Sequence, residues 1–265
     1  MSGVAIALVL SAAVVHAVWN RMLHGSTDRL ATATVGTVVG AVLLLPAAIA
    51  APPARAWPLV LLSGAAEAAY FLLLTAAYQR GELSLTYPVA RGVAPFLVTL
   101  GGAVVLGQVL DAARVGGSLT LGLGLAVISQ VGLAKGRGRA MMFAGLTGLA
   151  IATYSVIDAR AVRVASPVGY LGAVMAVAAM VLLVAARPGW QRLRAAAPTG
   201  AGVGVGTIAA YLLVLFAFQR APAAPVATLR ELSIVFGVLI ARDRPGKRVW
   251  LGAALCVLGA ALVVL

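Results

Sequence analysis

The sequence predicts an all-α membrane protein with ten transmembrane helices, arranged as two inverted five-helix repeats. Three observations lead to this prediction: an apolar composition, ten long apolar runs, and a pair of sequence landmarks that recurs along the chain. Of the 265 residues, 62% are hydrophobic and only 10% are charged, and the mean hydropathy is +1.05. A soluble domain is about 45–50% apolar and about 25% charged. The chain therefore lacks the polar residues that would cover a soluble surface.

The charge balance indicates a membrane surface as the partner, and not nucleic acid. There are 20 basic and 7 acidic residues, which gives a net charge of +13. In a soluble domain such an excess would indicate nucleic-acid binding. Here the basic residues lie between apolar runs, where they contact lipid headgroups. Cys256 is the one cysteine and lies in an apolar run, so we expect no disulfide within the chain, no metal and no cofactor.

Ten apolar runs are long enough to span a membrane, because a hydrocarbon core about 30 Å thick needs about 20 helical residues. They cover residues 3–20, 31–50, 59–79, 85–106, 115–134, 141–161, 168–186, 200–218, 222–241 and 249–265. The connectors are short and contain Arg, Pro or Gly. No basic residue precedes the first run, so we expect a retained helix and not a cleaved signal peptide.

Two landmarks recur in the same order about 140 residues apart. AYQR at residues 77–80 reappears as AFQR at residues 217–220, and an arginine follows each segment, at Arg91 and at Arg230. The offset divides the chain into five spans plus five. Because each unit has an odd number of spans, the second unit enters from the opposite side, which is the inverted repeat of many secondary transporters. We expect the two units at residues 1–134 and 141–265.

Four short segments carry a resemblance to a known family. They are HAVWN at residues 16–20, YPVARGVAP at 87–95, YSVID at 154–158 and LRELS at 229–233. With them the chain resembles the drug/metabolite transporter (DMT) superfamily, specifically its EamA-like branch, over essentially its full length. The resemblance implies a secondary carrier, often an exporter of amino acids or other metabolites. It also implies a cavity lined mainly by spans one, three, four, six, eight and nine, with spans five and ten packed together.

Two features depart from that family. Many relatives carry Glu at the end of the fourth span, where this chain has Gln108. The family also keeps both termini in the cytoplasm, whereas here thirteen basic residues lie in odd-numbered connectors and five in even-numbered ones. By the positive-inside rule, that count places the odd connectors in the cytoplasm and both termini outside. For orientation we follow the resemblance.

Five charged residues inside the expected spans are candidates for the site: Glu67, Arg91, Asp158, Arg230 and Glu231. A charge inside the bilayer is costly, so its first interpretation is functional. Glu67 has small neighbours and could bind substrate or a proton, or it could be permanently paired with Arg91 or Arg230. Asp158, near the end of its span, fits an interfacial residue as well as a cavity acid.

The two arginines are candidate anion-binding groups. Pro88 and Pro95 flank Arg91 and Gly92 follows it, a spacing that can interrupt the fourth span beside a cavity. Arg91 could bind a carboxylate or phosphate, or neutralise Glu67. Arg230 mirrors Arg91 in the second repeat. Its neighbour Glu231 points about 100° away on a helix, so we expect each of the two to need its own partner.

Uncharged candidates complete the expected site. His16 lies in a patch at the end of the first span, where a hydrogen-bonded structural role is the alternative to proton transfer. Tyr70 and Tyr211 lie in matching spans and could stack on a substrate or simply pack between helices. Glycine-rich segments in several spans indicate close helix contacts.

These residues predict a secondary active transporter of a small polar metabolite, an amino acid or an organic anion, with alternating access around a midplane cavity. We expect an exporter, with protons as a candidate coupling ion and lipids as neighbours. The composition is typical of a multi-pass protein of a bacterial inner membrane, and we expect a monomer. The alternatives are a multidrug efflux carrier, a passive channel and, least favoured, a membrane-embedded enzyme that would use His16 and Asp158.

Overall fold

The structure, a computed structural model, describes residues 1–80, 83–128, 138–240 and 246–264. These residues form eleven α-helices, α1 Gly3–His24, α2 Arg29–Ala50, α3 Trp57–Arg80, α4 Leu83–Leu106, α5 Ala112–Ile128, α6 Gly138–Ala161, α7 Pro167–Ala186, α8 Trp190–Phe218, α9 Ala223–Arg230, α10 Ser233–Ile240 and α11 Lys247–Val264. Eight of them are long and apolar enough to cross a membrane, and α5 is a shorter apolar helix. The boundary expected at residue 134 lies outside the described residues.

The ninth expected span is two short helices, so the prediction of one continuous helix over 222–241 is wrong. α9 ends at Arg230 and α10 begins at Ser233. Between them the N–H groups of Glu231 and Leu232 donate to carbonyls three residues back, both at 3.1 Å. This tighter spacing is of the 3₁₀ type and interrupts the α-helical ladder. The interruption lies at the two charged residues of the span.

The expected interruption of the fourth span is also not found. α4 runs continuously through Pro88, Gly92 and Pro95. Helices α5, α6 and α9 pack against it. Neighbouring helices make proline tolerable in membrane helices, because the freed backbone groups find other partners.

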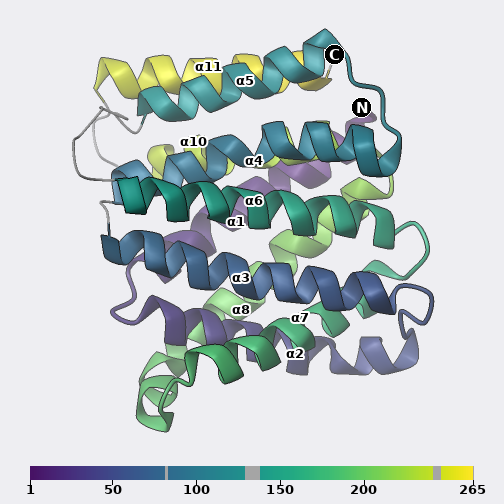
Figure 1. Ribbon diagram of the computed structural model, residues 1–265, viewed down its shortest axis with the longest axis vertical. Helices are drawn as coiled ribbons and strands as arrows, with labels where there is room; N and C mark the ends of the chain where they lie inside the picture. The colour runs from purple at the N-terminus through teal and green to yellow at the C-terminus, as the bar shows by residue number, and fades with distance from the viewer. Residues whose placement is uncertain (81–82, 129–137, 241–245, 265) are drawn as a thin grey trace.

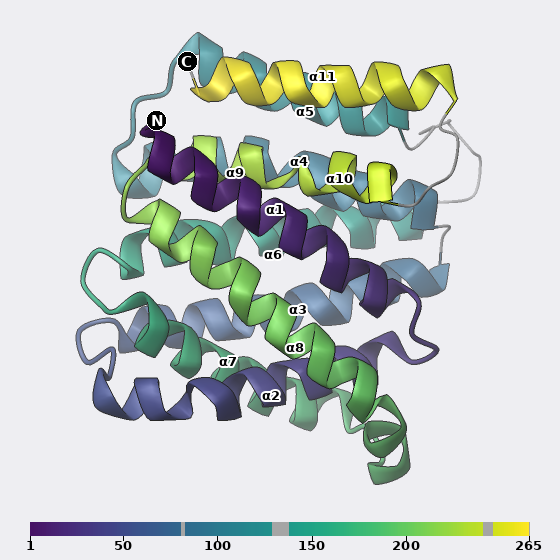
Figure 2. The ribbon, with the colours of Figure 1, turned by 180° about the vertical axis from the view of Figure 1, so that it is seen from behind.

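Helix contacts between the two halves are reciprocal. α1 packs on α8 and α3 packs on α6, while α2 pairs with α7, α4 with α9 and α5 with α11. Counting from the start of each half, the first helix meets the third, the third meets the first, and the second, fourth and fifth meet their own counterparts. Self-complementary contacts of this kind are expected at a two-fold axis. Figures 1 and 2 show the resulting bundle, with α5 and α11 side by side and antiparallel along one edge.

Glycines bring the backbones of α5 and α11 into direct contact. A Cβ at Gly117 would lie 2.6 Å from the Gly259 carbonyl oxygen, and one at Gly259 would lie 2.5 Å from the Gly117 carbonyl oxygen. Gly124 and Gly252 repeat the arrangement, each at 2.6 Å from the other's carbonyl oxygen. No larger residue fits at these positions, so these four glycines are packing residues.

Both chain ends lie at the same end of the bundle. The Met1 amino group donates to the Val264 carbonyl at 3.4 Å, and the two termini are neighbours in both ribbon views (Figures 1 and 2). α1 therefore runs away from this terminal end, and the α1–α2 connector lies at the opposite end. There Arg192 of α8 binds Asp28 with Nε 2.7 Å from Oδ2.

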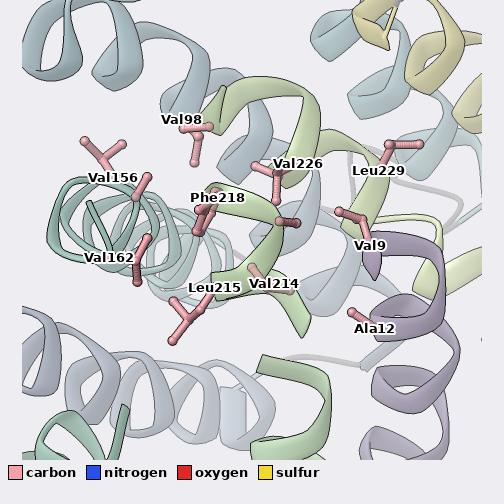
Figure 3. Packing of buried hydrophobic residues seen from close by; sticks show 14 of the residues in the cluster. Val9, Ala12, Val98, Val156, Val162, Val214, Leu215, Phe218, Val226 and Leu229 are labelled. Carbon is pink, nitrogen blue, oxygen red and sulfur yellow. The ribbon is translucent and has the colours of Figure 1, made fainter. Parts of the chain in front are cut away.

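Two buried apolar clusters fill the bundle. One surrounds Phe218 and lies toward the terminal end, with Val9, Val156 and Val226 among its members (Figure 3). The other lies toward the opposite end and includes Trp19, Leu23, Phe71, Leu74 and Ile151.

Candidate substrate cavity

A cavity lies between the two apolar clusters. α1, α3, α4, α6, α8 and α9 contribute its walls, the same six span positions that the family resemblance implies. The lining residues are Ala12, His16, Trp19, Glu67, Tyr70, Phe71, Arg91, Tyr154, Thr207, Ala210, Tyr211, Val214 and Arg230. Six of the eight site residues expected from the sequence are among them: His16, Glu67, Tyr70, Arg91, Tyr211 and Arg230. Glu231 and Asp158 lie behind the wall.

Arg91 is tied to the break between α9 and α10. Its Nε lies 2.6 Å from Glu231 Oε2, and its Nη2 donates to Ser233 Oγ at 3.0 Å. Both charged side chains are almost fully buried, at 2% and 0% exposure. The alternative that Arg91 neutralises Glu67 is not supported by this geometry, because the interrupted helix presents Glu231 to Arg91.

Arg230 is held more loosely. Its Nη2 donates to Ser155 Oγ at 3.3 Å, and its guanidinium lies 5.9 Å from the centre of the Tyr154 ring. Its Nε also comes within 3.9 Å of Glu231 Oε1. Glu231 keeps right-handed helical dihedrals, with φ −68° and ψ −15°, so the two neighbouring side chains leave the backbone in different directions and only their ends approach. Glu231 thus lies between two arginines and is the shared counter-charge of both.

Glu67 is a cavity acid. Its side chain is nearly buried and belongs to the cavity wall. Within the described part of the chain, no hydrogen bond or ion pair of its carboxyl group is found. The alternative of a permanent pair with Arg91 or Arg230 is therefore not supported by the geometry, and the carboxyl group is open to a ligand or a proton.

Asp158 is neither interfacial nor part of the cavity lining. It is 1% exposed and accepts hydrogen bonds from three hydroxyl groups. Ser63 donates to Oδ1 at 2.5 Å, Tyr170 donates to Oδ1 at 2.6 Å, and Tyr211 donates to Oδ2. These donors come from α3, α7 and α8, so one carboxyl group connects helices of both halves. Tyr211 is the residue that links this cluster to the cavity.

Aromatic side chains form much of the remaining wall. Tyr154 stands edge-to-face between Tyr70 and Tyr211, at centroid distances of 6.2 and 5.8 Å. His16 packs against Trp19 at 4.5 Å. Sequence reasoning did not single out Tyr154, although it lies four residues before Asp158 and thus on the same helix face. Thr207 and Phe71 were also missed, since nothing distinguishes them from packing residues in the sequence.

Gln108, the position where many relatives have Glu, holds the start of α9. Its side-chain oxygen accepts a hydrogen bond from the Ala223 N–H at 3.1 Å. The first N–H groups of a helix lack partners within the helix, and a side-chain oxygen supplies one. The amide replaces a carboxylate here without losing the capping acceptor.

Comparison with known proteins bears on the identity of the chain. The model of the EamA-like transporter family matches residues 138–265, from the start of α6 onward. Residues 138–265 belong to the EamA-like transporter family. The DMT-type resemblance is thereby confirmed over these residues, and eight of the described helices are long and apolar enough to make the chain a multi-pass membrane protein.

Solved structures share the fold of this chain. One of them, described only as a crystal structure of a protein, superposes with a TM-score of 0.77 at 21% sequence identity, and the match covers 98% of each chain. This likeness concerns the fold alone. A search of curated proteins found no match.

Proposed function

We propose that this EamA-like protein is a secondary active transporter of a small metabolite that carries a carboxylate, an amino acid or an organic anion. The observation that carries the proposal is the combination of Arg230 and Glu67 in one buried cavity. A guanidinium binds a carboxylate through charge-assisted hydrogen bonds. Glu67 offers the opposite charge, which suits the ammonium group of an amino acid.

The two arginines differ in how close they lie to the carboxylate of Glu231. Glu231 neutralises Arg91 at 2.6 Å and lies farther from Arg230, at 3.9 Å. Arg230 is thus the cation better able to exchange its protein contacts for a substrate carboxylate. The tyrosine wall would pack against the apolar part of the substrate.

The two-fold contact pattern supports a mechanism of alternating access. In our proposal, residues 1–134 and 141–265 are inverted repeats that rock about the cavity. The apolar cluster around Phe218 and the cluster around Trp19 and Leu74 would open in turn, so that the cavity faces one side of the membrane at a time. We propose export from a bacterial cell across its inner membrane, by a monomer that has no enzymatic activity.

Three probes that share a phenyl ring and differ in charge test the substrate class. Purified protein in liposomes is supplied with radiolabelled L-phenylalanine, 3-phenylpropionate or phenethylamine. We expect uptake of a probe with a carboxylate to exceed that of phenethylamine. Preference for L-phenylalanine indicates an amino acid carrier, and preference for 3-phenylpropionate an organic anion carrier. Preference for phenethylamine contradicts the proposal and favours multidrug efflux.

Two variants then test the assigned residues. Arg230→Met should reduce uptake of the carboxylate probes about tenfold or more, because a hydrogen bond to a charged group contributes about 1.5–3 kcal/mol. Glu67→Gln should reduce uptake of L-phenylalanine more than that of 3-phenylpropionate. Arg163→Met, at an exposed arginine in the α6–α7 connector, is the matched control and should transport like the wild type. Equal transport by all variants removes the assigned roles.

A further inference from the structure

The cluster around Asp158 has an arrangement that the substrate cavity does not explain. We propose that Asp158 is the binding site of a coupling proton, separate from the substrate site, and that the Tyr211 hydroxyl reports its protonation to the cavity. The inference rests on the proposed function in taking the protein to be a carrier, and it deepens that function by naming the site of the coupling ion.

The hydrogen bonds select the oxygen that takes the proton. Oδ1 accepts from both Ser63 and Tyr170, so its two lone pairs are occupied. Oδ2 accepts from Tyr211, and among the described residues no second donor to it is found. A carboxylate oxygen has two lone pairs available as acceptors. Oδ2 is therefore the atom with room for a proton.

Protonation at Oδ2 changes what Tyr211 can do. In the present arrangement, the carboxylate is acceptor-only and Tyr211 uses its hydrogen to donate to it. When Oδ2 binds a proton, the Oδ2–H group becomes a donor, and the nearest oxygen is that of Tyr211. The tyrosine then accepts this hydrogen bond, and its own hydrogen becomes free to turn into the cavity. One proton is bound, no covalent bond of the tyrosine breaks, and a new donor faces the substrate.

The position of the cluster suits a coupling site. Asp158 lies about one helical turn beyond Tyr154, and Ser63 one turn before Glu67, in both cases toward the terminal end. The cluster thus lies between the cavity and one face of the membrane. Two ionisable groups bond to it directly, Tyr170 on α7 and Tyr211 on α8. The cavity that Tyr211 also lines holds the other ionisable groups of the packed helices, Glu67 on α3, Arg91 on α4, Tyr154 on α6, Arg230 on α9 and His16 on α1.

The geometry also separates the roles of the two cavity-side acids. Glu67 has no hydroxyl cluster around it in the described part of the chain and faces the ligand space directly. Asp158 reaches that space only through Tyr211. A substrate can therefore occupy the Glu67 side while a proton occupies Asp158, and binding of each affects the other through one hydroxyl group.

Infrared difference spectroscopy tests the inference without a substrate, so its outcome is independent of the transport assay. The full chain is reconstituted in liposomes, and spectra are compared between about pH 5 and about pH 8, a range on either side of neutrality where a perturbed buried carboxyl group titrates. Glu67→Gln is the background, since it removes the other cavity acid. We expect a protonated-carboxyl band and a simultaneous shift of tyrosine ring bands.

Two further variants in that background decide the assignment. Addition of Asp158→Asn should remove both signals, and addition of Tyr211→Phe should keep the carboxyl band and remove the tyrosine shift. A carboxyl band that persists with Asp158→Asn overturns the proposal, as does the absence of any band in the Glu67→Gln background. If Asp158→Asn is not monodisperse in gel filtration, Tyr211→Phe decides: an unchanged tyrosine shift then overturns the proposal, and its loss supports it.

Discussion

The two halves of the chain are joined by ion pairs in two contrasting places. Arg91 Nε lies 2.6 Å from Glu231 Oε2 beside the cavity, and Arg192 Nε lies 2.7 Å from Asp28 Oδ2 at the end opposite the termini. The exposed fractions of the side chains are 2% and 0% in the first pair but 55% and 29% in the second. Loss of one partner leaves an uncompensated buried charge only in the first, whereas water and salt screen the second. The two N–O distances are nearly the same, but the buried pair contributes far more to stability when one partner is lost than the exposed pair does.

The largest expected effect is that of Glu231→Gln. It removes the counter-charge of Arg91 and the nearby acid of Arg230 while it keeps the size of the side chain. Leaving a buried charge unpaired costs about 3–5 kcal/mol, so the variant should unfold at a clearly lower temperature in detergent than the wild type. Unaltered thermal unfolding would mean that water, and not Glu231, compensates Arg91.

Replacing both members of the buried pair sharpens the comparison. In Arg91→Met with Glu231→Met, no uncompensated charge is left by the Arg91–Glu231 contact, and apolar side chains of similar size fill the space. Since buried ion pairs often contribute little net stability over apolar replacements, we expect the double variant to recover part of the stability lost in Glu231→Met, while Arg230 still lacks its nearby acid. Thermal unfolding of all three variants gives the coupling energy. If the stability lost in the double variant equalled the sum of the losses in the two single variants, this expectation would be contradicted.

A smaller effect is expected for Ser233→Ala. Ser233 accepts a hydrogen bond from Arg91 at the first residue of α10. Hydrogen bonds to charged groups contribute about 1.5–3 kcal/mol, and the ion pair with Glu231 remains in place, so we expect a loss at the low end of this range. Chemical unfolding in detergent measures it, with Ser26→Ala at the α1–α2 connector as the control. A loss as large as that of Glu231→Gln would show that Ser233 has a wider structural role.

The smallest effect belongs to the exposed pair. The hydrogen bond from Arg192 holds the pKa of Asp28 below its usual range. The pair therefore contributes stability above the unfolded pKa, about 3.9, and loses it as the pH falls through the folded pKa. We expect Asp28→Asn to shift thermal unfolding by about 2 °C or less at neutral pH. The difference from the wild type should shrink as the pH falls through the folded pKa of Asp28.

Charges inside apolar runs made the cavity predictable from the sequence. Glu67, Arg91 and Arg230 all line it, because a charge in a membrane helix is stable only against a polar space or another polar group. The apolar runs also gave the approximate extent of most helices, but α8 begins at Trp190, before the expected run over 200–218, and the ninth span is two helices. The pairing of α5 with α11 was implied by the family resemblance and is found in the structure.

Contacts that depend on helix rotation could not be predicted. Asp158 is bonded to Ser63 and Tyr211, which are 95 and 53 residues away in sequence. The periodicity of one span does not show which face of another span packs against it. The break after Arg230 was missed for a related reason: proline spacing pointed to α4, whereas the interruption in α9–α10 accompanies the burial of Glu231 between two arginines.

The glycine contacts between α5 and α11 have a mechanical consequence. Two helices whose backbones touch directly have no flexible side chains between them that would let one helix slide along the other. Each glycine at this contact faces a glycine on the partner helix. This pair is therefore suited to act as a stationary anchor while the six cavity helices tilt. A covalent tether between α5 and α11 should leave turnover intact, whereas the same tether between α1 and α8 should stop it.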